Sequence, residues 1–427
     1  MKTRKILHAA DIHLDSPLQK LDRYENAPVE QIRGASRRAL ANMTTLAIDQ
    51  EVDLVVIAGD LYDGDWTDQN TGLAFVAQAA RLSDAGIPLL VIRGNHDAAN
   101  LMTSSLPLPS QPEIGPMFLS EKKAETRILE DLGIAVHGQS FARRSESGNM
   151  AASYPDPING MFNLGMLHTG LEGNSMHANY APCTPRELTD KGYHYWALGH
   201  IHLRANHGLD GGPPIVFSGN LQGRHINETG EKGCLILNVD DRDNCEFSFH
   251  ACDVLRWHEC VIDVSKIKHQ EEVLDLFDVS IRKTLESAED RLLVTRVRLV
   301  GQTPLATELL RNEVKLRSDL QAVAVMVARE QLWLEDLRVR VQLPKANTNQ
   351  DLDGPLQSVT EVLGELRQSS DAEKTIGNEL DDLIKKLPTE LRNDAMFSAL
   401  PVNDPEWLAN LVDSAAAEVH ARIQSDQ

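Results

Sequence analysis

The sequence has little cysteine, few aromatic residues and no long apolar run. Its five cysteines form no Cys-x-x-Cys pair, which argues against a structural zinc knuckle and favours a reducing cytoplasm. No stretch approaches the roughly 20 uncharged apolar residues that cross a bilayer, so we expect no membrane segment. Positive charge is also scarce, because the net charge is −21. A nucleic acid would have to be bound by a local patch, by metal cations or through a partner chain.

What is present is an ordinary globular composition, with 42% hydrophobic and 25% charged residues in 427. This length predicts two or three domains. Apolar runs alternate with helical periodicity in the first 100 residues, which is typical of a parallel sheet with crossover helices. The predicted strands there are 6–10, 54–58 and 88–92, and the helices are 29–50 and 70–85. Later strands follow without helices between them, so we expect that half to be antiparallel; they are 162–167, 195–198, 214–217, 234–239 and 246–252.

The pattern changes near residue 254. A small α+β unit is predicted there, with strands at 254–264, 291–300, 321–328 and 332–342 and helices at 269–286 and 303–316. A polar segment with Pro and Gly then predicts a linker, followed only by helices. The predicted domains are 1–253, 254–342 and 355–427, with the linker at 343–354. Pro, Ser and Gly predict long surface loops at 100–126 and 141–158.

Five short segments concentrate Asp, Asn and His at the predicted ends of strands, where α/β sheets gather ligands. Carboxylate oxygen, amide oxygen and imidazole nitrogen suit Mn²⁺, with Fe and Zn as alternatives, and the lack of cysteine argues against a thiolate site. A closed structural zinc site needs about four ligands, whereas two ions that share a carboxylate need more. The segments therefore predict a two-metal site; they are Asp11-Ile12-His13, Gly59-Asp60-Leu61-Tyr62-Asp63, Gly94-Asn95-His96-Asp97, Gly165-Met166-Leu167-His168 and Gly199-His200-Ile201-His202.

The order of these segments resembles that of the calcineurin-like metallophosphoesterase superfamily over roughly residues 6–220. Within it, the opening at residues 7–15 and the Gly219–His225 stretch are most similar to the bacterial DNA-repair exonuclease subunits of the SbcD type. The resemblance implies a two-sheet metallophosphoesterase sandwich flanked by helices. It also implies a small capping domain, at 254–342, and a helical tail that binds a partner.

The resemblance further implies a role for each residue of the site. One metal ion takes Asp11, His13, Asp60 and His202; the other takes Asp60, Asn95, His168 and His200. Asp60 would bridge the ions. His96 would stabilise or protonate the scissile phosphate group, with Asp97 orienting its ring. Apart from the resemblance, Arg224 and His225 are candidates for phosphate binding, with a structural turn as the alternative. Asp63 is a candidate partner within the site or a DNA contact, with capping of the following helix as the alternative.

By this resemblance the protein is an Mn²⁺-dependent DNA nuclease that acts as an exonuclease subunit in DNA repair or processing. It would form a homodimer and bind an SbcC-like coiled-coil ATPase through its C-terminal helices. A phosphatase or small-molecule phosphodiesterase with the same site is the alternative, because two metals cleave monoesters and diesters alike. A non-catalytic scaffold that keeps the fold is a third reading. Activity on DNA and on a phosphomonoester distinguishes the first two.

Overall fold

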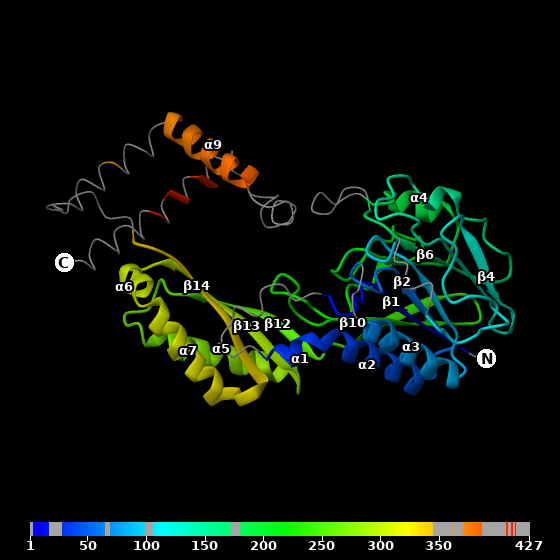
Figure 1. Cartoon of the computed structure of the whole chain (residues 1–427), viewed down its shortest axis with the longest axis horizontal. Helices are drawn as coiled ribbons and strands as arrows, with labels where there is room; N and C mark the ends of the chain where they lie inside the picture. The colour runs from blue at the N-terminus through cyan, green and yellow to red at the C-terminus, as the bar shows by residue number, and fades with distance from the viewer. Residues whose placement is uncertain are drawn as a thin grey trace. The chain divides into compact units, whose positions relative to one another are not determined.

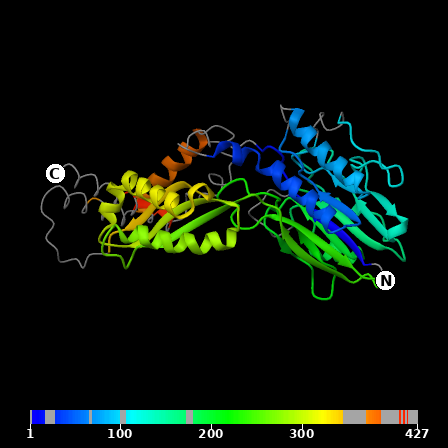
Figure 2. The same cartoon turned by 90° about the horizontal axis from the view of Figure 1, so that it is seen from below.

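The computed structural model describes residues 3–16, 28–64, 69–98, 106–171, 180–344 and 370–386, together with positions 362, 407, 408, 411, 412 and 415. Contacts within the chain divide it into two compact units (Figures 1 and 2). The first comprises Met1–His258 with Asp290–Val294, and the second comprises Glu259–Glu289 with Thr295–Gln427.

The first unit begins with a five-stranded sheet of order β11-β10-β1-β2-β3. Its three N-terminal strands are parallel, as the sequence predicts, and β10 joins β1 antiparallel. Each strand lies close to a predicted one, because long runs of Val, Ile and Leu favour buried strands. The bounds are Arg4–Ala9 for β1, Leu54–Ala58 for β2, Leu89–Ile92 for β3, Gly233–Val239 for β10 and Cys245–Ala251 for β11.

A six-stranded sheet of order β4-β5-β6-β7-β9-β8 completes this unit. The expected antiparallel arrangement is wrong for its centre, because β5, β6, β7 and β9 all run parallel. The strand β4 begins inside the loop expected at 100–126, and neither β4 nor β5 was predicted. The bounds are Glu125–Leu129 for β4, Ile134–Gly138 for β5, Phe162–His168 for β6, Tyr195–Gly199 for β7, Ala205–Asn206 for β8 and Ile215–Phe217 for β9.

The helices of the first unit follow the predicted crossovers with two differences. The single helix expected at 29–50 is divided at Gly34 into α1 (Val29–Arg33) and α2 (Ala35–Asp49). The helix expected at 70–85 is α3 (Gln69–Asp84). A short helix that was not predicted, α4 (Pro185–Asp190), starts at a capping box formed by Thr184 and Glu187.

The core shows that the two sheets form a sandwich flanked by helices. Leu7 and Val55 belong to a cluster with residues of α2 and α3, such as Met43. Their neighbours along the strands, Ile6 and Val56, instead join a cluster with the six-stranded sheet. Because successive side chains of a strand point to opposite faces, one face of the five-stranded sheet packs on helices and the other on the second sheet. The predicted sandwich is confirmed.

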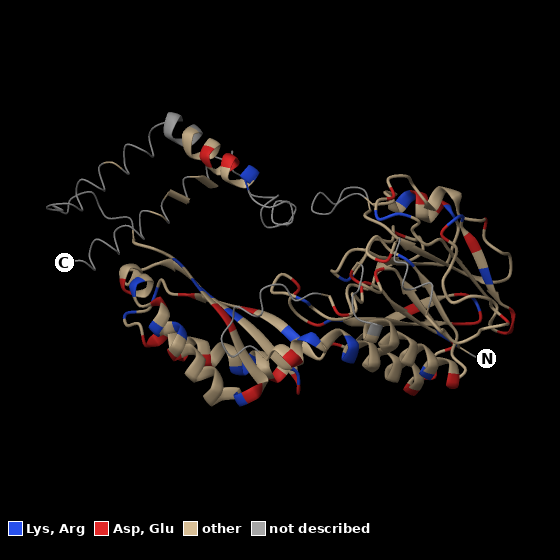
Figure 3. Ribbon diagram, in the orientation of Figure 1, with Lys and Arg blue, Asp and Glu red and all other residues tan. Residues whose placement is uncertain are grey.

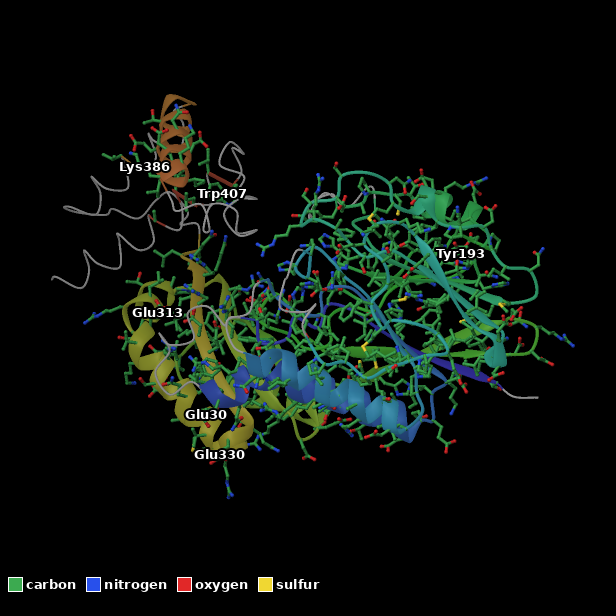
Figure 4. All side chains as sticks on the ribbon, turned by 45° about the vertical axis from the view of Figure 1, so that its right-hand side comes forward. Glu30, Tyr193, Glu313, Glu330, Lys386 and Trp407 are labelled. Atoms are coloured by element: carbon green, nitrogen blue, oxygen red, sulfur yellow. The ribbon has the colours of Figure 1, made fainter. Side chains whose placement is uncertain are left out.

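The outer face of the six-stranded sheet has a core of its own. Trp196 and Leu198 on β7 pack there with Leu188 of α4. Tyr193, labelled in Figure 4, stacks on Trp196 with ring centroids 4.9 Å apart, and its other neighbour is His137 of β5 at 4.3 Å. Both sheets are therefore fixed between apolar layers, which makes their carboxyl edges a rigid support.

His8 lies inside β1 and is fully buried, as expected for a core histidine. Its ring nitrogens lie 3.0 Å from the Tyr195 hydroxyl and 3.3 Å from the Leu198 carbonyl oxygen. Burial lowers the pKa of His8 to about 3, so the unfolded chain takes up a proton there first as the pH falls. We expect the free energy of unfolding to fall by about 1.4 kcal/mol per pH unit below pH ~6.5 from this group.

A His8→Gln protein keeps a polar side chain that can bond both partners but does not titrate. Urea unfolding at pH 7.5 and pH 5 measures the effect. Between these two pH values we expect the free energy of unfolding of the parent to fall by about 2 kcal/mol more than that of the variant. An equal loss in both proteins would show that His8 makes no such contribution.

The second unit is built on the three-stranded sheet β12-β13-β14. Its observed helices differ from the prediction at two points. The helix expected at 303–316 is divided at Asn312 between α6 and α7, and the strand expected at 321–328 is the C-terminal half of α7. The apolar run there, Val-Ala-Val-Met-Val, suggested a strand, but Leu316, Leu320 and Ala324 are buried at helical spacing. The bounds are Leu255–Asp263 for β12, Leu292–Gln302 for β13, Leu332–Gln342 for β14, Glu272–Ala288 for α5, Ala306–Arg311 for α6 and Glu313–Ala328 for α7.

The strands of this unit carry both basic and acidic residues (Figure 3). Arg296 of β13 contacts both carboxylate oxygens of the buried Glu335 on β14, at 2.7 and 2.6 Å. Arg298 lies 3.0 Å from Glu259 on β12. These arginines hold neighbouring strands together through ion pairs.

In the C-terminal region the structure describes α9 (Ser370–Lys386), whose end Figure 4 labels at Lys386. Most of the last predicted helix lies outside the described residues, and so does most of the predicted linker at 343–354. No helix in the described part of the chain has the length and apolar character that crossing a membrane requires.

Candidate metal centre

Strand ends from both sheets of the first unit bring the predicted metal ligands together. Asp11 and His13 follow β1, Asp60 follows β2, and Asn95 follows β3. From the second sheet, His168 is the last residue of β6 and His200 follows β7 directly. Parallel strands end at a common edge, so seven residues that are far apart in sequence meet at one place.

The backbone at these positions is unusual. Asp11, His13, Asp60 and His200 have φ angles of 51°, 45°, 51° and 102°, in the region that non-glycine residues rarely adopt. Strained residues of this kind cluster at functional sites, where the surrounding structure holds them. Gly94 contributes by its size, because a Cβ there would lie 2.3 Å from Asp60 Oδ1. The chain can therefore pass this close to Asp60 only because residue 94 is a glycine.

The side-chain donor atoms converge in two groups with Asp60 between them. In the first group, His13 Nε2 lies 3.1 Å from His202 Nε2, and Asp11 belongs to the same cluster. In the second, Asn95 Oδ1 lies 3.0 Å from His168 Nε2 and 3.2 Å from His200 Nδ1. Asp60 Oδ2 lies 3.8 Å from His13 Nε2 and 3.4 Å from His168 Nε2. This arrangement fits two cations that share one carboxylate.

The electrostatics of the site also fit a cation. Burial lowers the pKa of His168, but the charges of Asp60 and Asp11 outweigh it and raise that pKa to about 9. Burial likewise raises the pKa of Asp60, but the adjacent histidines hold it well below its usual range. The position next to these carboxylates therefore stabilises positive charge despite its burial. A divalent ion supplies that charge more effectively than a proton on His168.

His96 lies at the same edge, with its ring more open to solvent. Its side chain is 41% exposed, and its Nδ1 lies 2.6 Å from Asp63 Oδ1. Burial lowers the pKa of His96, but the bond to Asp63 reverses the direction and raises it. His96 also has a nitrogen within 4.8 Å of donor atoms of His13 and Asp60. Its predicted role as a proton donor and not as a metal ligand stays a prediction.

The residue that orients His96 differs from the one expected. Asp97 does not contact the ring: its buried carboxylate accepts the backbone N–H groups of Leu61 at 2.9 Å, Tyr62 at 2.7 Å and Gly94 at 3.2 Å. It thereby joins the loops after β2 and β3. Asp63, in the loop that follows β2, contacts His96 instead. Adjacency in sequence suggested Asp97, but successive residues of a turn point in different directions.

Two substitutions separate these roles. We expect Asp63→Asn to lower kcat by about 10²-fold, because His96 loses the carboxylate that orients and charges it. We expect Asp97→Asn to lower the free energy of unfolding by about 3 kcal/mol, because an amide replaces an acceptor of three backbone bonds. Thermal unfolding of both proteins measures the change in stability, and enzyme kinetics of both proteins measures the change in kcat. If Asp63→Asn instead lost much stability and kept its kcat, Asp63 would have the structural role that we assign to Asp97.

The two predicted phosphate-binding residues occupy the side of the site next to His202. The Arg224 guanidinium lies 3.5 Å from Asp63 Oδ2 and 3.3 Å from Glu228 Oε1. His225 lies 3.5 Å from Glu228 and is 54% exposed. Sequence reasoning missed Glu228, which lies 2.7 Å from His202 Nδ1. Its position three residues after the Gly219–His225 stretch is the only signal in the sequence that could have drawn attention to it.

Comparison with known proteins gives two matching family models. The model described as calcineurin-like phosphoesterase matches residues 4–204, which include all seven predicted metal ligands. The model described as metallophosphoesterase YhaO, middle domain, matches residues 257–342. The uncharacterized metallophosphoesterase YhaO of Bacillus subtilis (strain 168) is 30% identical over 302 residues, which cover 70% of this chain and 72% of that protein. This chain belongs to the calcineurin-like metallophosphoesterase family.

Two further relatives of this metallophosphoesterase are archaeal. The DNA double-strand break repair protein Mre11 of Sulfurisphaera tokodaii is 28% identical over 223 residues, covering 52% of this chain and 54% of that protein. The protein of the same name from Sulfolobus acidocaldarius is 22% identical over 326 residues, covering 74% of this chain and 80% of that protein. The resemblance that the sequence motifs indicate is confirmed, and with it a phosphoesterase that uses divalent metals.

Proposed function

We propose that this metallophosphoesterase is an Mn²⁺-dependent DNA nuclease that hydrolyses phosphodiester bonds, acting as an exonuclease subunit in DNA repair or processing. The observation that carries the proposal is the position of Asp60 between two groups of donor atoms, 3.8 Å from His13 and 3.4 Å from His168. Such a site suits two ions that hold one phosphate group. The relatives whose names state a role in DNA double-strand break repair support DNA as the substrate.

The residues divide the chemistry between them. Asp11, His13 and His202 would hold one ion, Asn95, His168 and His200 the other, and Asp60 both. When bound, two divalent ions activate a water molecule and stabilise the charge on the phosphate. His96, held by Asp63, is exposed enough to reach a substrate and would protonate the leaving 3′-oxygen. Asp97 would keep the loops that carry Asp60 and Asn95 in register.

The acidity of the chain bears on how DNA is bound. With a net charge of −21, nonspecific attraction to DNA is weak, and the predicted phosphate-binding residue Arg224 is already paired with Asp63 and Glu228. We therefore include in the proposal a homodimer and an SbcC-like coiled-coil ATPase that binds the C-terminal helices and supplies basic surface in the cytoplasm. This partner would present the DNA end to the metal site.

A phosphatase or small-molecule phosphodiesterase is the alternative function. The same donor atoms would hold a phosphomonoester, so the site alone favours neither substrate. The nuclease is favoured by the relatives whose names state a role in DNA double-strand break repair. We therefore rank DNA first.

The test compares two substrates with the same protein. Purified protein, with and without Mn²⁺, is incubated with end-labelled linear duplex DNA and with a chromogenic phosphomonoester, and His96→Ala serves as the control. We expect Mn²⁺-dependent loss of DNA that the variant lacks. If the protein hydrolysed the monoester and left the DNA intact, the phosphatase function would replace the proposed nuclease function.

A further inference from the structure

A buried carboxylate outside the predicted ligand set lies directly behind one metal ligand. Glu228 is 6% exposed, and its Oε1 lies 2.7 Å from His202 Nδ1. Its Oε2 accepts the backbone N–H of Arg224 at 2.7 Å and the side-chain amide of Asn220 at 2.9 Å. Since a buried acid is retained only when it is well paired, this set of bonds fixes Glu228 in one position.

The bond to Glu228 sets which nitrogen of His202 is available to a metal. A carboxylate accepts a hydrogen bond, so His202 Nδ1 donates its proton to Glu228 and Nε2 is the ring nitrogen that faces the other donor atoms. Nε2 is the atom that lies 3.1 Å from His13 Nε2, within the first group of donor atoms. The Arg224 guanidinium lies 3.4 Å from the same Nδ1 and cannot donate to a nitrogen that already carries a proton. The shorter contact with Glu228 therefore decides which ring nitrogen of His202 donates and which one faces the other donor atoms.

The segment that carries Glu228 also holds the backbone of His202. Lys232, four residues further on and 7% exposed, donates from Nζ to the His202 carbonyl oxygen at 3.3 Å. His202 itself lies in a loop after β7, where no strand pairing fixes it. Residues 228–232 thus hold the ring of His202 and contribute to holding its backbone, whose carbonyl oxygen also accepts the Asn220 N–H at 3.4 Å.

Arg224 connects this arrangement with the other side of the site. Its guanidinium lies 3.3 Å from Glu228 Oε1 through one nitrogen and 3.5 Å from Asp63 Oδ2 through another. Asp63 in turn contacts His96 at 2.6 Å. One arginine therefore joins the carboxylate behind His202 to the carboxylate behind His96.

We infer that Glu228 is a positioning residue of the metal centre, which holds His202 with Nε2 directed at one of the two ions. The inference rests on the two-metal site of the proposed function. It requires no contact of Glu228 with substrate. Partners of this kind behind a metal ligand typically change metal affinity by 10–100-fold.

The experiment measures Mn²⁺ binding by titration calorimetry with the metal alone, for the parent and Glu228→Gln. Glutamine keeps the shape of the side chain but removes the charge that fixes the ring. We expect one ion to bind with parental affinity and the other 10–100-fold more weakly. Activity should return at saturating Mn²⁺, which a misfolded protein would not show. Glu125→Gln is the matched control, because Glu125 pairs with a backbone N–H and with Arg127 but lies on β4.

A second measurement does not depend on the variant folding. Nitrogen NMR of the ¹⁵N-histidine-labelled parent, without metal, shows which ring nitrogen of His202 is protonated; its signals are assigned by their loss in His202→Gln. The inference requires a proton on Nδ1, and a proton on Nε2 alone overturns it. Parental affinity for both ions in Glu228→Gln also overturns it and leaves the proposed function intact. A parent that binds no Mn²⁺ overturns both.

Discussion

We expect the Asp60→Asn protein to lose Mn²⁺ binding at both positions and to hydrolyse phosphodiesters at least about 10³-fold more slowly than the parent. Asp60 is the only one of the predicted ligands placed between the two groups of donor atoms, and an amide lacks the second charged oxygen needed to bridge them. A two-metal site contributes several kcal/mol to the transition state, and each 1.36 kcal/mol corresponds to a tenfold change in rate.

The substitution should leave the fold intact. Asp60 Oδ1 accepts the backbone N–H of His96 at 2.9 Å, and the amide oxygen of the Asp60→Asn variant would still accept that bond. Metal content by mass spectrometry and initial rates on duplex DNA measure the outcome. Asp190→Asn is the control, because Asp190 is an exposed aspartate at the end of α4. Two tightly bound ions in the Asp60 variant would show that another group bridges them.

The His96→Ala protein should bind both ions normally but cleave DNA about 10²–10⁴-fold more slowly, the range typical of a lost general acid. His96 is more exposed than the predicted ligands around it and is held by Asp63, so removing its ring leaves the two groups of donor atoms in place. The loss should depend on the leaving group. A nitrophenyl diester releases a stable anion that needs no proton, so its hydrolysis should fall much less.

Parallel rate measurements on DNA and on bis(p-nitrophenyl) phosphate reveal this difference, and calorimetry with Mn²⁺ checks that metal binding is retained. Imidazole added in solution should partly restore cleavage of DNA by filling the space of the lost ring. If the rates on the two substrates fell by the same factor and the affinity for Mn²⁺ fell as well, His96 would be a metal ligand. Its nearness to His13 and Asp60 also permits that role.

The sequence locates the strand ends that carry the predicted ligands better than it predicts the sheet to which half of these ends belong. Each metal segment follows an apolar run, and strand ends can be located from such runs without knowing how the strands pair. Pairing depends on contacts between distant segments, so the parallel order of β6, β7 and β9 was missed. The strand β4 was missed because it contains charged and polar residues such as Glu125 and Arg127, which do not indicate a buried strand. The strand β5 was missed because its apolar run, from Ile134 to Val136, is only three residues long.

Local composition also misled the prediction in the second unit. Val325 and Met326 lie on α7 with 61% and 75% of their surfaces exposed, so the apolar run at 321–328 does not mark a buried strand. Gly34, by contrast, divides the first predicted helix, a break that glycine favours and periodicity alone overlooks.

The partners of the predicted site residues were the least predictable part of the site. Asp63 and Asp97 are both aspartates near His96 in the motifs, and only the direction of each side chain shows which contacts its ring. Glu228 reaches His202 across 26 residues of chain. Motif spacing identifies metal ligands because their chemistry restricts residue type, whereas any carboxylate can orient a histidine from many positions.

The most direct test of the account is a crystal structure of the protein with Mn²⁺, measured at the manganese absorption edge. For a two-metal centre we expect two anomalous peaks about 3.5–4 Å apart, with Asp60 in contact with both. One peak should lie against His13 and His202, and the other against Asn95, His168 and His200. A single peak, or two peaks that Asp60 does not join, would contradict the two-metal centre on which the proposed nuclease rests.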